Sequence, residues 1–237
     1  MNKKQIRLLI IGIIITVVII VGVILTIHFV SKYKKNQELM RMIKEYYNSK
    51  VETFKEENIK IKEDGIVVDL VFLGDSITDN CDVSKYYSEY VSLNRGIGGD
   101  TTTGLLARMQ ESLYDVNCKV VIMCIGCNNY RNMFDDYEEL LIGIKEHKPD
   151  AKVIIVSMPP LSLDYQGQSE AFIDCNKRVK EYAIQYNFSF VDIYYPLYDS
   201  ERKCVKDGMT IDGVHPSHES YLIISGLVKE EIEKLLN

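Results

Sequence analysis

Short apolar runs alternate with helix-like segments over residues 66–237. The strongest runs are almost wholly apolar, which is typical of parallel strands that are buried on both faces of a sheet. We predict strands at 66–73, 92–97, 119–125, 152–157 and 189–193, a helix-like stretch reaching residue 90, and helices at 102–114, 136–147, 170–186 and 217–236. This alternation predicts an α/β domain with a doubly wound parallel sheet and helices on both faces. Ligands of such sheets bind beyond the carboxyl ends of the strands.

The N-terminal part of the chain has a different pattern. Residues 8–30 contain no Asp, Glu, Lys or Arg and are mostly Ile, Val and Leu. At about 1.5 Å per residue, this run is long enough to cross a hydrocarbon core of about 30 Å. We therefore predict a single-pass transmembrane anchor. The alternatives are a buried core helix and a cleaved signal peptide, whose apolar region usually has only about 7–15 residues.

The segments that flank this run are basic. Their charged side chains are Lys3, Lys4, Arg7, Lys32, Lys34 and Lys35. The positive-inside comparison is nearly tied, and the free amino terminus favours a short cytoplasmic tail at 1–7. Residues 66–237 would then lie on the extracytoplasmic side of the cell membrane. Between them, residues 31–65 read as a basic stop and a helical stalk, with apolar side chains at roughly helical spacing over 36–60. The alternative is a helix that packs on the body.

Beyond residue 35 the chain is acidic. All 34 Asp and Glu residues lie there, with 22 of the 28 Lys and Arg residues. Such a body repels phosphate backbones, so we expect no nucleic-acid partner. The six cysteines also lie in this part. The only CxxC pair, Cys124 and Cys127, lacks a second pair that would complete a zinc site, and the sequence leaves the disulfide state open.

Polar motifs follow three successive predicted strands. The first strand leads into Gly74-Asp75-Ser76, where the serine hydroxyl would be exposed at a turn from strand to helix. The second leads into the glycine-rich stretch 94–102, and the third into 126–129, where an asparagine amide can donate a hydrogen bond. Each motif alone also fits an ordinary turn or helix cap. Their common place at one edge of the sheet favours a catalytic site.

A base for such a serine is available near the C-terminus. His215, one of only four histidines, stands three residues after Asp212. A serine nucleophile needs a neighbouring base, and the base needs an orienting acceptor. We therefore predict Ser76 as the nucleophile, His215 as the base and Asp212 as the acceptor, and we interpret His218 as a surface residue. The alternative is a metal site formed by Asp207, Asp212, His215 and His218.

Four blocks in this order resemble those of the SGNH, or GDSL, hydrolase family. They are Gly-Asp-Ser-Ile, Gly-Ile-Gly-Gly-Asp-Thr-Thr, Gly-Cys-Asn-Asn and Asp-Gly-Val-His-Pro. They span residues 74–216, and the similarity covers about 66–237. The Gly-Gly-Asp-Thr-Thr and Gly-x-Asn-Asn forms resemble the platelet-activating-factor acetylhydrolase branch and its bacterial relatives. The resemblance implies a three-layer α/β/α, flavodoxin-like fold and a serine esterase that needs no metal or cofactor.

The resemblance also implies a role for each matching residue. His215 would act first as a base and then as an acid, and Asp212 would fix its tautomer. The oxyanion hole would be formed by the backbone N–H groups of Ser76 and Gly99 and the side-chain amide of Asn128. One block departs from the common Gly-Gly-Asn-Asp form, because Cys127 replaces a glycine and Asn129 the aspartate. A cysteine side chain beside the oxyanion hole would reshape the substrate pocket, so this departure affects the expected substrate more than the expected catalytic reaction.

We expect a membrane-anchored hydrolase that cleaves carboxylic esters through an acyl-serine intermediate. Short loops and the lack of a lid domain favour a short-acyl substrate, such as O-acetyl groups on carbohydrate or a small lipid. The loop at 158–170 would form a wall of the substrate site. The alternatives are an acyltransferase or thioesterase with the same triad, and a catalytically silent, membrane-tethered binding domain. The sequence leaves the acyl chain, the alcohol and the oligomeric state open.

Overall fold

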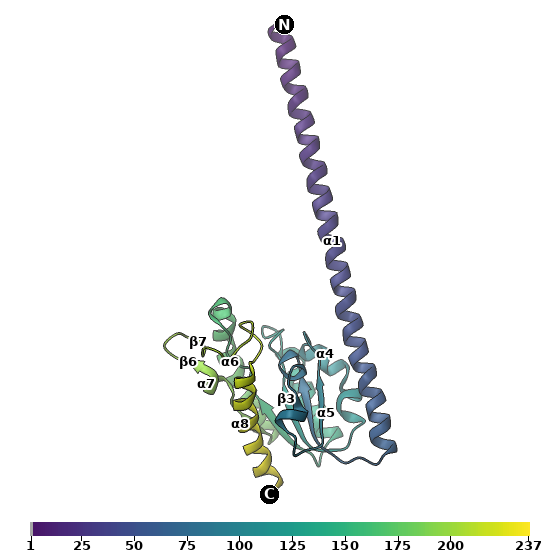
Figure 1. Ribbon diagram of the computed structural model, residues 1–237, viewed down its shortest axis with the longest axis vertical. Helices are drawn as coiled ribbons and strands as arrows, with labels where there is room; N and C mark the ends of the chain where they lie inside the picture. Colours follow the sequence, from purple (N-terminus) through teal and green to yellow (C-terminus); the bar gives the residue numbers. More distant parts are fainter. Residues whose placement is uncertain (1) are drawn as a thin grey trace. The chain divides into compact units, whose positions relative to one another are not determined.

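The structure, a computed structural model, describes residues 2–237, apart from the side chains of residues 8–11 and 13–19. The chain forms two units, Met1–Ser49 and Lys50–Asn237. The second unit contains a five-stranded sheet in the order β2-β1-β3-β4-β5, in which all neighbours are parallel (Figure 1). Its strands are β1 (Val68–Gly74), β2 (Ser92–Gly96), β3 (Cys118–Cys124), β4 (Lys152–Val156) and β5 (Ser189–Val191). This order is that of flavodoxin-like folds, so the predicted α/β sheet is confirmed.

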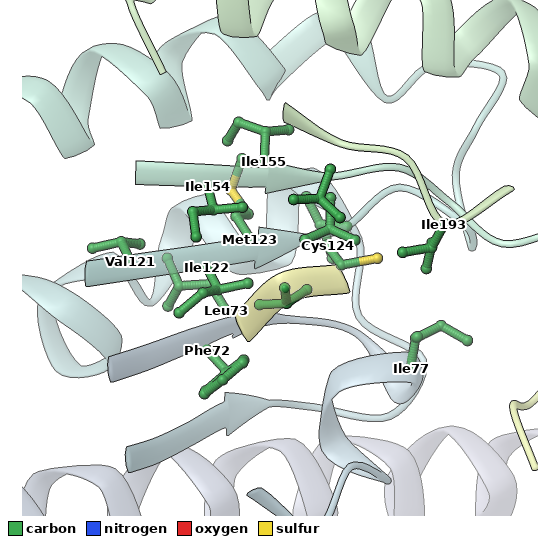
Figure 2. Packing of buried hydrophobic residues seen from close by; sticks show 14 of the residues in the cluster. Phe72, Leu73, Ile77, Val121, Ile122, Met123, Cys124, Ile154, Ile155 and Ile193 are labelled. Carbon is green, nitrogen blue, oxygen red and sulfur yellow. The ribbon is translucent and has the colours of Figure 1, made fainter. Parts of the chain in front are cut away.

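The centre of the sheet forms the hydrophobic core. Phe72, Ile122 and Ile154 lie opposite one another on β1, β3 and β4 and are at most 5% exposed (Figure 2). Ile77 and Ile193 lie beyond the carboxyl ends of the strands in the same view. The apolar runs in the sequence are continuous because both faces of these central strands are covered.

Helices connect the strands. The longer ones are α5 (Phe134–His147), α6 (Gln166–Tyr186) and α8 (His218–Leu236), and the short ones are α2 (Ser76–Asp79), α3 (Val83–Tyr86), α4 (Thr102–Ala107) and α7 (Tyr194–Leu197). Helix α3 contacts α8, and α4 contacts α5, so the helices pack in two groups. Figure 1 shows α5 and α8 on either side of β3. A 3₁₀ turn, η2 (Leu163–Tyr165), and a small antiparallel pair, β6 (Tyr198–Asp199) with β7 (Cys204–Val205), complete the unit.

Two of the predicted helices are shorter than expected. The stretch up to residue 90 forms only the single turns α2 and α3, because the Asp82 side chain accepts a hydrogen bond from the Lys85 N–H and starts a new helix. The predicted helix 102–114 is interrupted at Arg108, whose φ of −119° leaves the helical region. A π-helical turn, η1 (Gln110–Tyr114), follows. At Asp82, a side-chain hydrogen bond overrides the apolar periodicity.

The first helix, α1 (Lys3–Glu63), contains the predicted anchor and most of the predicted stalk. Among the residues whose side chains are described, no helix combines the length and the apolar character needed to span a membrane. The predicted anchor, 8–30, falls partly on residues 8–11 and 13–19, whose side chains lie outside the described part of the chain. The anchor therefore stays a prediction.

The last turns of α1 belong to the second unit, although the sequence pattern places the start of the catalytic domain at residue 66. Phe54 is only 2% exposed and Asn58 only 7%. Asn58 donates a hydrogen bond from Nδ2 to the carbonyl of Glu111 at 2.7 Å. The segment 50–63 is thus packed against the domain rather than forming only a stalk.

Candidate active site

Ser76 is the first residue of α2, directly after β1. The preceding residue, Asp75, caps this short helix through its Oδ1 atom, which accepts a hydrogen bond from the Ile77 N–H at 3.0 Å. Complete burial raises the pKa of Asp75 to about 6, although hydrogen bonds from Ile77 and Cys127 favour the ionised form. The cap holds the turn that presents the Ser76 hydroxyl at the carboxyl edge of the sheet.

His215 and Asp212 share one tight turn before α8. The Oδ1 atom of Asp212 accepts hydrogen bonds from the backbone N–H groups of Val214 at 3.0 Å and His215 at 2.8 Å. Gly213 has a φ of +89°, and a side chain there would collide with Ser162, so glycine suits this position on both counts. The Ser162 N–H donates to the Gly213 carbonyl at 2.9 Å. The loop that follows β4 therefore holds the turn in place.

The three predicted residues form a continuous chain of hydrogen bonds. His215 Nε2 lies 3.0 Å from Ser76 Oγ, and His215 Nδ1 lies 2.7 Å from Asp212 Oδ2. Partial burial opposes ionisation of Asp212, but the hydrogen bonds from His215 and Val214 outweigh it and lower the pKa of Asp212 to about 2. An ionised Asp212 accepts the Nδ1 proton and leaves Nε2 free to accept the proton of Ser76.

Two backbone N–H groups on the loops that follow β1 and β2 lack a hydrogen-bond partner among the described residues. Residues 97–100 form a turn closed by the Asp100 N–H and the Ile97 carbonyl at 3.1 Å, with Gly99 at a φ of +78°. In the described part of the chain, neither the Ser76 nor the Gly99 N–H has a hydrogen-bond partner. Asn128 Nδ2 donates to the Asp100 carbonyl at 2.8 Å and retains a second N–H. The predicted oxyanion donors are thus placed on adjoining loops, and their role stays a prediction.

Beneath these loops lies a buried ion pair between Arg108 and Asp100 that the sequence did not predict. Arg108 is 1% exposed, and its Nε donates to Asp100 Oδ2 at 2.8 Å. Its remaining N–H groups donate to the Arg95 carbonyl at 2.7 Å, the Ser112 hydroxyl at 2.8 Å and the Gly74 carbonyl at 3.0 Å. Arg108 therefore connects the ends of β1 and β2 to the turn at residues 97–100. The only signal for it in the sequence is a single arginine within an apolar helical stretch.

The alternative metal site is not assembled. His218 Nδ1 lies 2.7 Å from the Tyr86 hydroxyl, and Asp207 pairs with Arg202. Among the described residues, no group of three or more His, Cys, Asp or Glu side chains is placed to hold a metal ion. His218 is separated in this way from the hydrogen-bonded chain of Ser76 and His215.

The unusual third block has a structural explanation. Asn129 Nδ2 donates to Thr102 Oγ1 at 2.8 Å, which connects this block to the start of α4. Cys127 is 7% exposed, and burial raises the pKa of its thiol well above the ordinary value. The Cys127 carbonyl accepts a hydrogen bond from Gln168 Nε2 at 3.1 Å, so α6 reaches the edge of the site. All six cysteines are free thiols.

Comparison with known proteins finds relatives in one family. Human platelet-activating factor acetylhydrolase IB subunit alpha2 is 32% identical over 101 residues, which cover 39% of this chain and 44% of that protein. The beta subunit homologue from Drosophila melanogaster is 31% identical over 101 residues, or 39% of this chain and 45% of its own length. The chain thus matches less than half the length of these curated relatives.

Solved structures share the fold. A GDSL-like lipase from Bacteroides thetaiotaomicron has a TM-score of 0.67 and 26% identity, covering 80% of this chain and 98% of that one. An acetylxylan esterase from Geobacillus stearothermophilus has a TM-score of 0.57 and 23% identity, covering 70% and 94%. The model of the GDSL-like Lipase/Acylhydrolase family matches residues 72–223, which include Ser76, Asp212 and His215. This chain, with its serine at the end of β1 and its histidine before α8, belongs to the GDSL-like lipase/acylhydrolase family.

Proposed function

We propose that the protein hydrolyses short-acyl carboxylic esters through an acyl-serine intermediate. The hydrogen-bonded chain from Ser76 through His215 to Asp212 carries this proposal, with distances of 3.0 and 2.7 Å. These are the contacts that a serine nucleophile needs to lose its proton and that a histidine needs to keep the correct tautomer. A silent binding domain would have no need to keep all three side chains in register.

The reaction proceeds in two steps, acylation of Ser76 and hydrolysis of the acyl-serine. Ser76 Oγ attacks the ester carbonyl carbon while its proton passes to His215 Nε2, and the N–H groups of Ser76 and Gly99 hold the developing oxyanion. The tetrahedral intermediate collapses, and the alcohol leaves with the proton from His215. Water then attacks the acyl-serine, gives its proton to His215, and releases the acid as Ser76 regains its proton. Asp212 stays ionised throughout and stabilises the imidazolium.

Acetyl esters are the substrate class that the relatives favour. The curated relatives are named acetylhydrolases, and one structural neighbour is an acetylxylan esterase, so an O-acetyl group on carbohydrate or a small lipid fits. We test this with p-nitrophenyl esters from acetate to palmitate, measured on the full chain in detergent. We expect kcat/KM to be highest for acetate and to fall beyond butyrate. A maximum at palmitate would overturn the short-acyl assignment, and transfer to an added alcohol at the expense of hydrolysis would identify an acyltransferase.

Replacing Asn128 with alanine should lower kcat by about 10²–10³-fold, because one donor to the oxyanion is lost. The side chain is exposed and its one hydrogen bond is to the Asp100 carbonyl, so we expect little change in the melting temperature. Steady-state kinetics on p-nitrophenyl acetate check the prediction, with the neighbouring Asn132→Ala as a control on the same loop. An unchanged kcat would remove Asn128 from the oxyanion hole.

We also propose that residues 8–30 attach the protein to a membrane, with the catalytic domain on the extracytoplasmic side. The support is the sequence, in which this run has no charged residue and is flanked by lysines. Retention of the full chain in membranes after an alkaline carbonate wash tests the attachment. Release by the wash, or an N-terminus cleaved near residue 30, would contradict it.

A further inference from the structure

The last turns of α1 carry a lysine that reaches the catalytic edge of the sheet. Lys50 Nζ lies 2.7 Å from Asp79 Oδ1. Asp79 is the last residue of α2, the helix that begins with Ser76. Its side chain is only 9% exposed, and that of Lys50 is 29% exposed, so the pair is largely shielded from solvent. An ion pair at such a site is screened less than one on the open surface.

The second oxygen of the same carboxylate holds the turn at residues 97–100, which carries the Gly99 N–H. Asp79 Oδ2 accepts a hydrogen bond from the Gly98 N–H at 2.8 Å. Gly98 and Gly99 are the two central residues of the turn that Ile97 and Asp100 close. The direction of the Gly99 N–H depends on the peptide plane between these glycines, and a glycine pair has little conformational preference of its own. The Asp79 contact and the bond to the Ile97 carbonyl both hold the preceding peptide, between Ile97 and Gly98, and so limit how the plane that carries the Gly99 N–H can turn.

The backbone around Asp79 is fixed independently. Asn94 Nδ2 donates to the carbonyls of Thr78 at 2.7 Å and Cys81 at 2.9 Å, which ties α2 to β2. Lys50 binds Oδ1 of the Asp79 carboxylate while the Gly98 N–H binds Oδ2, so the ion pair favours the rotation of the carboxylate that meets Gly98. A charged acceptor forms a stronger hydrogen bond with a backbone N–H than a neutral one does.

From these contacts we infer that Asp79 is a positioning residue for the oxyanion hole and that Lys50, from the N-terminal helix, sets its orientation. The inference rests on the proposed function, because it assigns a task within the same reaction. It gives one residue of the segment 50–63, Lys50, a part in positioning the Gly99 N–H, through Asp79 and Gly98 in turn. Neither Lys50 nor Asp79 touches the reacting atoms.

The test is Lys50→Met in the full chain, which removes the charge and keeps the length of the side chain. We expect kcat for p-nitrophenyl acetate to fall about tenfold, less than for complete loss of an oxyanion donor, with KM changed less than twofold. The inhibition constant of a boronic acid, which forms a tetrahedral anion on the serine, should rise by a similar factor. Lys50→Arg should restore both values. Asp79→Asn, which keeps the shape but not the charge, should reproduce the loss.

The matched control is Lys55→Met, because Lys55 lies on the same helix and, among the described residues, pairs with Glu52 at 3.3 Å and Glu111 at 3.9 Å rather than with Asp79. Kinetics of Lys50→Met equal to those of Lys55→Met, in an active wild type, would overturn the inference and leave the proposed function intact. So would a fall in kcat that merely follows a lower melting temperature and leaves the inhibition constant of the boronic acid unchanged. A folded wild type that neither hydrolyses esters nor binds the boronate would overturn both proposals.

Discussion

Ser76→Ala should abolish ester hydrolysis, with kcat lower by about 10⁶-fold or down to the background of the assay. The alanine has no oxygen to attack the carbonyl carbon, so no acyl intermediate can form, and His215 is left without a proton to accept. Because the Ser76 hydroxyl makes its one described contact with His215 Nε2, the change should leave the fold intact. The measurement is a rate assay on p-nitrophenyl acetate with purified full chain.

A fluorophosphonate provides the second readout. Wild-type protein should gain one phosphonyl group, located at Ser76 by peptide mass spectrometry, and Ser76→Ala should gain none. Ser84→Ala is the matched control, because Ser84 is an exposed serine in α3 whose hydroxyl donates a hydrogen bond to Asp82. Hydrolysis that survives in Ser76→Ala would show that another group performs the chemistry, and the proposed mechanism would fail.

Asp212→Asn should lower kcat by about 10⁴-fold with a small effect on KM. The asparagine has nearly the same shape, and its oxygen can still accept from the backbone of the turn. Its amide, however, can face His215 Nδ1 as a donor, which stabilises the tautomer that carries its proton on Nε2. In that tautomer the imidazole cannot accept the proton of Ser76, although the 3.0 Å contact is kept.

The control for this change is Asp207→Asn, an exposed aspartate in the same region that pairs with Arg202. Its kinetics should be unchanged, as should those of His218→Ala. Since the pKa of Asp212 is lowered to about 2, the carboxylate stays ionised above about pH 4. The acid limb of the kcat/KM profile should therefore report the protonation of another group in the wild type. A loss of less than tenfold in Asp212→Asn would mean that His215 is oriented without this carboxylate.

The sheet was predictable because its strands are covered on both faces. Observed strand ends differ from the predicted ones by two residues or fewer on all five strands, and on the central strands β1, β3 and β4 a continuous apolar run marks the strand. The short helices after β1 were not predictable from periodicity. Their limits are set by single side-chain caps at Asp75 and Asp82, and such caps compete with the hydrophobic pattern rather than follow it.

The candidate catalytic residues could be selected from motifs, but the residues that hold them in place could not. Arg108 and Arg95 are both almost completely buried, against the usual tendency of arginine. Their acceptors are a loop aspartate, backbone carbonyls and residues of α1, and no local spacing in the sequence relates these groups. The same reason hides the contact between Lys50 and Asp79, which are 29 positions apart. Tertiary partners of this kind are decided by packing, not by pattern.

Asp212 and His215 share a single turn of four residues, and the aspartate accepts backbone as well as ring hydrogen bonds from it. The Asp212 carboxylate and the His215 imidazole therefore move as one unit when the backbone of this turn fluctuates. A displacement of the whole turn changes the distance from His215 Nε2 to Ser76 Oγ but keeps the hydrogen bond between His215 Nδ1 and Asp212 Oδ2. The distance from Ser76 Oγ to His215 Nε2 therefore determines whether the serine can pass its proton to the histidine. A ligand that binds between these two atoms would prevent the transfer and leave the turn unchanged.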